Sequence, residues 1–155
     1  MAKQGYSNLN LEELNKLTTL TAKEGGIYVL TMHFKSFTPD ALNALHLRLD
    51  ELENIEGTIA LVTTSDHSKI YSAGIDFQVF TMPQIEVMGF LWLFNRLLAR
   101  MMKVGYPTIA CMNGHAYAGG FMFAMAHDFR VLREDLGTCC LSEIDIGAGL
   151  PRGMV

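Results

Sequence analysis

The chain has 155 residues, of which 50% are hydrophobic and 18% are charged, a composition too apolar and too weakly charged for a disordered protein. Its length fits a single domain. The formal net charge of −4, from 12 basic and 16 acidic residues without a basic cluster, argues against a nucleic-acid-binding surface and against a polybasic membrane-binding patch.

The amino-terminal residues predict an arm ahead of a core domain. Leucines recur between Asn8 and Thr21 with partial helical spacing, and two glycines at 25 and 26 then break the chain. We therefore expect residues 1–24 to form an appended arm and residues 25–155 to form the core domain. Three glutamates in the arm argue against a mitochondrial presequence, and the arm has no apolar secretory core.

The first half of the core reads as a strand, a helix and a second strand. Residues 27–32 are rich in strand-forming side chains. Thr38 is expected to cap a helix that has Pro39 at its first position and leucines at helical spacing, and that ends near Gly57. Residues 58–64 form a short apolar run, as expected for a strand buried on both faces.

The second half continues the alternation of helices and strands. Residues 83–103 carry methionine, leucine, phenylalanine and tryptophan around most of a long helix, which we expect to be largely buried. Strands are expected at 108–112, 129–132 and 138–141, and a helix at 121–127. Together these elements predict an α/β fold. The methionines of the long helix are interpreted as core or subunit-contact residues: Met88, Met101 and Met102.

An uncharged stretch from Val104 to His127 is long enough to cross a bilayer. It contains too many glycines and polar residues for one lipid-exposed helix, so we expect a buried strand, a turn and a buried helix instead, and no membrane span. The three cysteines, at 111, 139 and 140, give no disulfide framework, and the adjacent pair would point to opposite faces of a strand. This usage favours a reducing compartment.

Glu143 is the leading candidate for acid–base chemistry. It follows the expected strand 138–141 and precedes another apolar segment, and burial among apolar neighbours disfavours the charged form of a carboxylate. Such a carboxylate suits a general base that works near neutral pH. The alternative interpretation is a glutamate that caps a helix or forms an ion pair.

Two glycine-containing turns are candidate binding sites for developing negative charge. Residues 73–76 and 118–120 each leave a strand or loop and start a helix, where backbone N–H groups lack partners and glycine allows close approach. Each could equally be an ordinary tight turn. Asp76 fits a helix N-cap better than a catalytic acid, and His115 and His127 are interpreted as structural because no metal-ligand spacing is present.

Five segments follow one another through most of residues 25–153. They are Pro39 with Asn43–Leu45, Tyr71–Phe77, Pro107–Ala110 with Asn113–Gly120, His127–Val131, and Ser142–Gly147. Taken together they resemble the crotonase superfamily, the enoyl-CoA hydratase/isomerase group, and their pattern is most similar to peroxisomal, plant-type 3-enoyl-CoA isomerases. The resemblance implies a spiral of ββα units.

The resemblance also implies the site and the reaction. The backbone amides of Ile75 and Gly119 would form an oxyanion hole for an acyl-CoA thioester, with no metal and no further cofactor. Glu143 would be the catalytic base. Family hydratases use a second glutamate at the position of Met122, so isomerisation by one base in fatty-acid β-oxidation is favoured over hydration. The remaining substrate-binding positions implied are Ala73, Gly74, Asp76 and Ser142.

The sequence ends at Val155, short of the carboxyl-terminal helices of the family. We therefore expect a homotrimer, or partner subunits that cover the exposed side. Other interpretations are a non-catalytic crotonase-like subunit of a larger complex, and, with less support, an enoyl-CoA hydratase or an acyl-CoA thioesterase. The family resemblance suggests the peroxisome, but the carboxyl end lacks a Ser-Lys-Leu signal, so mitochondrion and cytoplasm stay open.

Overall fold

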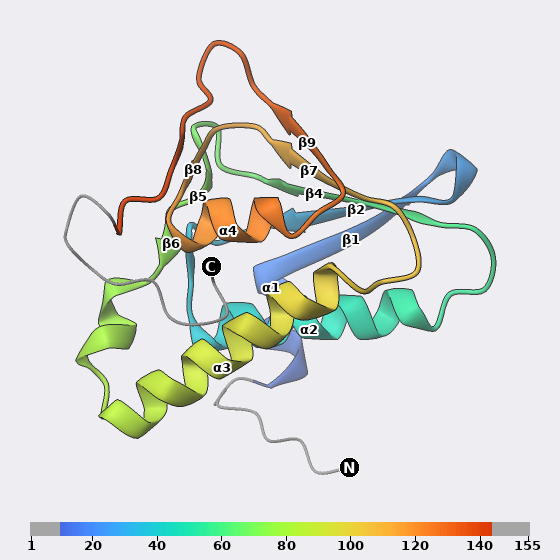
Figure 1. Cartoon of the computed structure of the whole chain (residues 1–155). Helices are drawn as coiled ribbons and strands as arrows, with labels where there is room; N and C mark the ends of the chain where they lie inside the picture. The colour runs from blue at the N-terminus through green and yellow to red at the C-terminus, as the bar shows by residue number, and fades with distance from the viewer. Residues whose placement is uncertain (1–9, 144–155) are drawn as a thin grey trace.

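The structure of the chain is a computed structural model that describes residues 10–143 (Figure 1). The helices are α1 (Leu11–Leu17), α2 (Pro39–Glu53), α3 (Gln84–Met101) and α4 (Gly119–Met125), with 3₁₀ turns η1 (Glu24–Gly26) and η2 (Phe77–Thr81). The strands are β1 (Thr18–Lys23), β2 (Ile27–Met32), β3 (Ser36–Phe37), β4 (Ala60–Ser65), β5 (Ile70–Ser72), β6 (Gly74–Ile75), β7 (Thr108–Met112), β8 (His115–Tyr117), β9 (Phe129–Leu132) and β10 (Cys139–Cys140).

The principal sheet has five strands in the order β1-β2-β4-β7-β9. Strand β1 pairs antiparallel with β2, and the other neighbours are parallel, as expected where helices connect successive strands. Two small parallel sheets, β10-β8-β5 and β3-β6, lie beyond the carboxyl ends of the central strands. The α/β fold predicted from the sequence is confirmed.

Helices α2 and α3 pack together beneath the principal sheet, and α4 packs against β5, β6, β7 and β8 (Figure 1). Helix α2 begins as predicted, because the Thr38 hydroxyl accepts a hydrogen bond from the Ala41 amide at 3.2 Å and Pro39 occupies the first position. The centre of the core is aromatic. The Phe37 ring lies 5.2 Å from Phe94 and 5.6 Å from Phe123, which joins β3, α3 and α4.

The amino-terminal segment differs from the predicted arm. The helix ends at Leu17, and residues 18–23 form an edge strand of the principal sheet instead of continuing the helix. Three threonines in this stretch, which are β-branched, favour a strand, and its pairing with β2 satisfies the backbone. The boundary expected after residue 24 therefore falls within the β1–β2 hairpin. Residues 1–9 of the arm lie outside the described residues.

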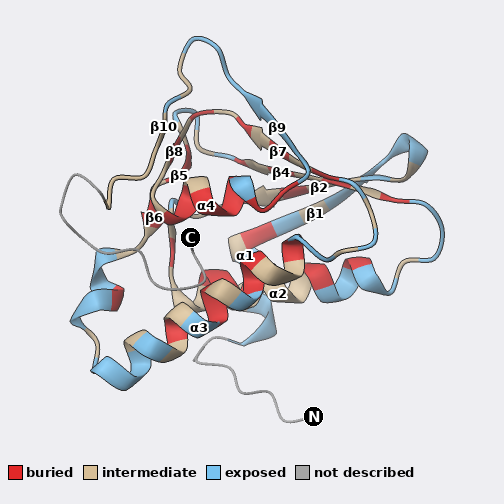
Figure 2. Ribbon diagram, in the orientation of Figure 1, coloured by how far each residue is buried: buried red, intermediate tan, exposed pale blue. Residues whose placement is uncertain are grey.

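Helix α3 is less buried than the sequence predicts. Its inner face is buried, whereas Ile85, Met88 and Trp92 are exposed on the outer face (Figure 2). Met101 is buried but Met102 is exposed. Strand β4 likewise alternates between buried and half-buried residues instead of being buried on both faces. None of the helices within residues 10–143 combines the length and the apolarity needed to cross a bilayer.

Candidate functional site

The two predicted glycine turns lie against each other in the folded chain. Ile75 is in β6 and Gly119 is the first residue of α4. A Cβ atom on Gly119 would lie 3.5 Å from the Ile75 nitrogen and 3.2 Å from its Cγ1 atom. A Cβ atom on Gly74 would lie 2.9 Å from the Tyr117 carbonyl oxygen and 3.2 Å from the Gly119 nitrogen. The turns can approach this closely only because these positions are glycine.

The backbone at this contact is strained. Gly74 has φ +93°, a conformation that favours glycine. Ala118 has φ +48°, and it is the one non-glycine residue with positive φ in the part of the chain that the structure describes. The Ala118 amide donates to the Cys140 carbonyl at 2.8 Å, which ties this turn to β10. Such outliers cluster where the backbone is held for function.

The Ile75 amide is oriented by its neighbours. The Gly74 amide donates to Ser72 Oγ at 3.2 Å, and the Asp76 amide donates to the Phe37 carbonyl at 3.0 Å. Because successive residues of an extended segment point to opposite sides, the Ile75 N–H faces away from β3. The Gly119 amide opens α4, and the first amides of a helix have no acceptor within the helix. Two adjacent N–H groups can therefore meet one oxyanion.

Glu143 lies three residues beyond β10, which pairs with β8. The hydrogen bonds between these segments include Ala116 N to Thr138 O at 2.9 Å and that of Ala118 described above, so β10 follows the segment that leads into Gly119. Glu143 is half-buried, and its Oε2 atom is buried with no hydrogen-bond partner among residues 10–143. A buried carboxylate oxygen of this kind has the capacity to accept a hydrogen bond from a ligand.

Met122 is on α4, one turn after Gly119, and is 9% exposed. Helix α4 carries no carboxylate, because all its residues are glycine, alanine, phenylalanine or methionine. A thioether neither transfers a proton nor orients water as a carboxylate does. Position 122 therefore offers no group for acid–base chemistry.

Residues 72–76 have mainly structural contacts. The buried Ser72 hydroxyl accepts from the Gly74 amide and donates to the Lys35 carbonyl at 3.4 Å. The Ala73 amide donates to the same carbonyl at 2.7 Å. Asp76 caps η2, as the sequence predicts, with its carboxylate accepting from the Gln78 amide at 2.9 Å. Ser142 is half-buried in the turn before Glu143.

A cavity of about 340 Å³ lies between η2 and the first turns of α2 and α3. Asp76 lines it, but neither Ile75 nor Gly119 does, so the cavity adjoins the two glycine turns without containing them. Its lining combines carboxylates with apolar side chains and comprises Thr38, Pro39, Asp40, Asp76, Gln78, Val79, Met82, Glu86 and Phe90.

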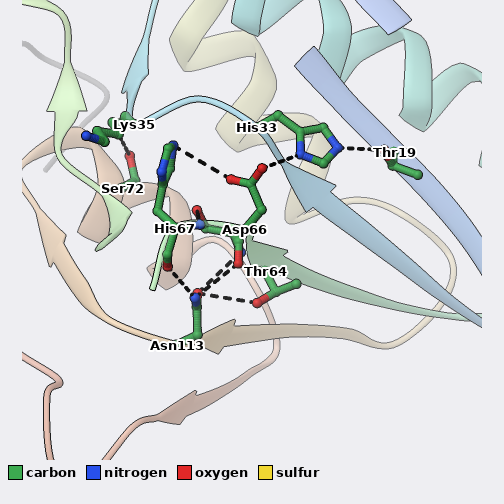
Figure 3. A network of polar contacts seen from close by, with 9 residues as sticks. Thr19, His33, Lys35, Thr64, Asp66, His67, Ser72 and Asn113 are labelled. Atoms are coloured by element: carbon green, nitrogen blue, oxygen red, sulfur yellow. Dashed lines mark hydrogen bonds and ion pairs between the residues drawn. The ribbon is translucent and has the colours of Figure 1, made fainter. Parts of the chain in front are cut away.

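Sequence reasoning missed the polar network at the ends of β2, β4 and β7 (Figure 3). The Asn113 side chain donates to the carbonyls of Ser65 at 3.0 Å and His67 at 2.8 Å, which fastens the loop after β4. His33 joins Asp66 at 2.7 Å and the Thr19 hydroxyl at 2.6 Å. An asparagine after a buried strand gives no sign of which loop it holds, because its partners are more than 40 residues away.

The two histidines predicted to be structural differ in their bonding. His127 is 4% exposed, and both ring nitrogens have partners: Thr63 Oγ1 at 2.9 Å and the Phe123 carbonyl at 2.8 Å. Burial lowers the pKa of His127 to about 4, so the ring is neutral near pH 7. His115 stacks on Tyr117 with ring centroids 5.4 Å apart, and its buried Nδ1 has no hydrogen-bond partner within the described part of the chain.

The sequence matches the family model described as enoyl-CoA hydratase/isomerase over residues 22–154. It is 32% identical over 136 residues to "Enoyl-CoA delta isomerase 3" of Arabidopsis thaliana, which covers 83% of this chain and 57% of that protein. A "Short-chain-enoyl-CoA hydratase" of Clostridium acetobutylicum is 28% identical over 146 residues, covering 91% of this chain and 54% of that protein. The chain thus spans little more than half the length of these relatives.

Solved structures share the fold of this chain. DspI of Pseudomonas aeruginosa superposes with a TM-score of 0.77 at 25% identity, over 85% of this chain and 55% of that one. A probable enoyl-CoA hydratase of Mycobacterium tuberculosis superposes with a TM-score of 0.79 at 24% identity, over 87% of this chain and 57% of that one.

Proposed function

The chain belongs to the enoyl-CoA hydratase/isomerase family and has the crotonase fold expected from its sequence, and from this premise we propose that it is an enoyl-CoA isomerase of fatty-acid oxidation. The proposed reaction moves the double bond of a 3-enoyl-CoA to the 2-position. The observation that carries the proposal is the contrast between two positions. Glu143 has a buried oxygen with no hydrogen-bond partner among residues 10–143, whereas position 122, where the resemblance places the second glutamate of family hydratases, is a buried methionine.

The thioester carbonyl oxygen binds at the amides of Ile75 and Gly119. Glu143 removes a proton from C2, and the electron pair of the broken C–H bond enters a dienolate whose negative charge lies on the carbonyl oxygen. The protonated carboxyl group then delivers its proton to C4, which leaves the double bond between C2 and C3. Oxyanion donors of this kind lower a barrier by a few kcal/mol each, and a positioned base adds a factor of about a hundred or more.

Hydration requires a second proton-transferring group, and position 122 does not supply one. Adding water across a double bond requires one group to orient and deprotonate the water and another to protonate carbon. A buried methionine on α4 supplies neither function. Isomerisation needs only one carboxyl group, which takes the proton and returns it.

The test is turnover of a 3-enoyl-CoA by the purified 155-residue chain, followed by the absorbance of the conjugated 2-enoyl thioester. We expect turnover by the parent, a loss of about a hundredfold or more in Glu143→Gln, and unchanged activity in Glu134→Gln, which alters an exposed glutamate. We also expect no hydration of a 2-enoyl-CoA.

Two outcomes would overturn the proposal. A folded parent that binds CoA but does not turn over substrate would favour a non-catalytic crotonase-like subunit. Full activity in Glu143→Gln would remove Glu143 from the catalytic step.

A further inference from the structure

Three buried polar side chains form a hydrogen-bonded chain next to the two glycine turns, residues 73–76 and 118–120, which carry the proposed oxyanion amides. Tyr71 and Thr63 are fully buried and His127 is 4% exposed. The Tyr71 hydroxyl lies 2.8 Å from Thr63 Oγ1, which lies 2.9 Å from His127 Nε2, and His127 Nδ1 lies 2.8 Å from the Phe123 carbonyl. None of these side chains was predicted to contribute to the site.

The hydrogen bonds among Tyr71, Thr63 and His127 can form with only one arrangement of donors and acceptors. The Phe123 carbonyl can only accept, so His127 Nδ1 carries the proton. In a neutral imidazole Nε2 then accepts, which makes the Thr63 hydroxyl its donor and leaves Thr63 Oγ1 to accept from Tyr71. Burial, which lowers the pKa of His127 and raises that of Tyr71, keeps both groups neutral. The three side chains therefore have one hydrogen-bonding arrangement.

The two ends of this chain lie on the two segments that carry the oxyanion amides. Tyr71 is in β5, next to Ser72, whose hydroxyl accepts from the Gly74 amide just before Ile75. At the other end, Phe123 is on α4, one turn after Gly119. Thr63 joins the two ends from the central strand β4.

Apolar packing alone would fix the relative positions of β5 and α4 less precisely. The Phe123 ring packs on Phe37 and edge-on against His127, but hydrophobic contact is not directional. Hydrogen bonds of 2.8–2.9 Å fix both distance and angle, and a buried donor or acceptor that loses its partner is costly. A slide of α4 along β5 would break at least one of them.

We propose that the Tyr71–Thr63–His127 chain is a positioning device that sets the spacing of the Ile75 and Gly119 amides. This inference rests on the proposed function for its catalytic consequence, but the placement of the two amides can be tested without turnover. None of the three side chains contacts the reacting atoms in this proposal; they act through the backbone of β6 and α4. Misplacing such donors lowers kcat, whereas the rest of the thioester still binds and KM stays nearly constant.

The matched variants are Thr63→Val, which removes the hydroxyl at nearly constant volume, and Thr63→Ser, which keeps it. Tyr71→Phe removes the other end of the same hydrogen bond. Tyr106→Phe is the control for loss of a phenol. The Tyr106 hydroxyl is buried with no hydrogen-bond partner among residues 10–143, and Tyr106 lines a separate cavity with Leu52 and Gly57.

The first measurement is the position of the Ile75 and Gly119 backbone cross-peaks in ¹H–¹⁵N spectra of the ligand-free variants. Both should move in Thr63→Val and Tyr71→Phe and stay near the parent position in Thr63→Ser and Tyr106→Phe. The second is turnover, where we expect kcat to fall about tenfold to a hundredfold at nearly constant KM in the first pair only. Thr63→Val and Tyr71→Phe remove the same hydrogen bond. The double variant should therefore lose little more kcat than either single variant.

Unmoved cross-peaks in folded Thr63→Val and Tyr71→Phe would overturn the inference, whatever happens to turnover. An equal rise in KM and fall in kcat would overturn the catalytic consequence, because it would show general damage to binding. If the cross-peaks move in the variants but the parent protein has no turnover, the positioning of the amides is supported and the proposed function fails. Failure of this inference is therefore distinguishable from failure of the proposed function.

Discussion

Gly120 packs directly on Ser72, so that a Cβ atom on Gly120 would lie 2.6 Å from both the Cβ atom and the carbonyl oxygen of Ser72. The first turn of α4 is therefore flush against β5. This contact brings the Gly119 amide beside β6, because Ser72 is only three residues before Ile75 in the chain. The close approach of two backbones at this point is a requirement of the site as well as of the fold.

Gly120→Ala should destabilise the protein. The added methyl group meets backbone atoms that cannot move aside without shifting β5 or α4, and overpacking of this kind costs about 1–3 kcal/mol. Urea denaturation measures the difference. Gly105→Ala is the control, since a Cβ atom there has no neighbour within 4 Å, and it should be neutral or slightly stabilising. Equal stability of the two variants would contradict the packing described.

Arg48→Met should loosen the amino-terminal segment. The guanidinium group donates to the hydroxyl and the carbonyl of Thr18 at 3.0 and 2.9 Å and to the Asn15 side chain at 2.9 Å. Loss of these hydrogen bonds leaves Thr18 unsatisfied, so we expect a cost of about 2–3 kcal/mol and faster hydrogen exchange in β1. Lys16→Met breaks only an exposed ion pair and should cost less than about 0.5 kcal/mol.

Stability should fall between pH 6.5 and pH 4. Burial lowers the pKa of His127 to about 4 in the folded protein, so the unfolded chain binds this proton more readily. The stabilisation is complete above the unfolded pKa of about 6.5 and is lost as the pH falls toward 4, by about 3 kcal/mol. The pKa of His46 is also lowered by burial and acts in the same direction.

The measurement is the free energy of unfolding in urea at several pH values. His127→Gln should remove most of the pH dependence, and His46→Gln should leave the contribution of His127 in place. A pH profile of His127→Gln parallel to that of the parent would show that His127 does not titrate in this way.

The two faces of α3 should respond differently to truncation. Leu97 is fully buried, and Leu97→Ala is expected to cost about 2–5 kcal/mol through lost contacts and the cavity left behind. Met88 is 59% exposed, and Met88→Ala should change the free energy of unfolding by less than about 0.5 kcal/mol. Thermal or urea unfolding of the two variants decides this. A large cost at Met88 would indicate that another surface covers this face.

Much of the fold could be predicted where the signal is local. Thr38 and Pro39 mark the start of α2 because capping depends on residues within one turn. Strand β7 has the predicted bounds, since a short apolar run between glycine and proline signals has few other conformations. Asp76 caps η2 for the same local reason.

Local signals failed where a distant partner decides the conformation. Leucine spacing suggested that the helix continues through residues 18–21, but pairing with β2 makes this segment a strand. The apolar side chains around α3 suggested burial on all sides, and only the packing of α2 and the sheet shows which face is covered.

By itself, the sequence determined the alternation of strands and helices, the two glycine turns, and a lone glutamate after the last strand. These depend on residue types within a few positions of one another. The resemblance already paired Ile75 with Gly119, and the tertiary structure shows how closely their segments pack. Only the tertiary structure decided that Thr63 reaches His127, 64 residues away along the chain. Such contacts depend on the path of the whole backbone, because the closure of long loops is set by many packed residues together and by no single motif.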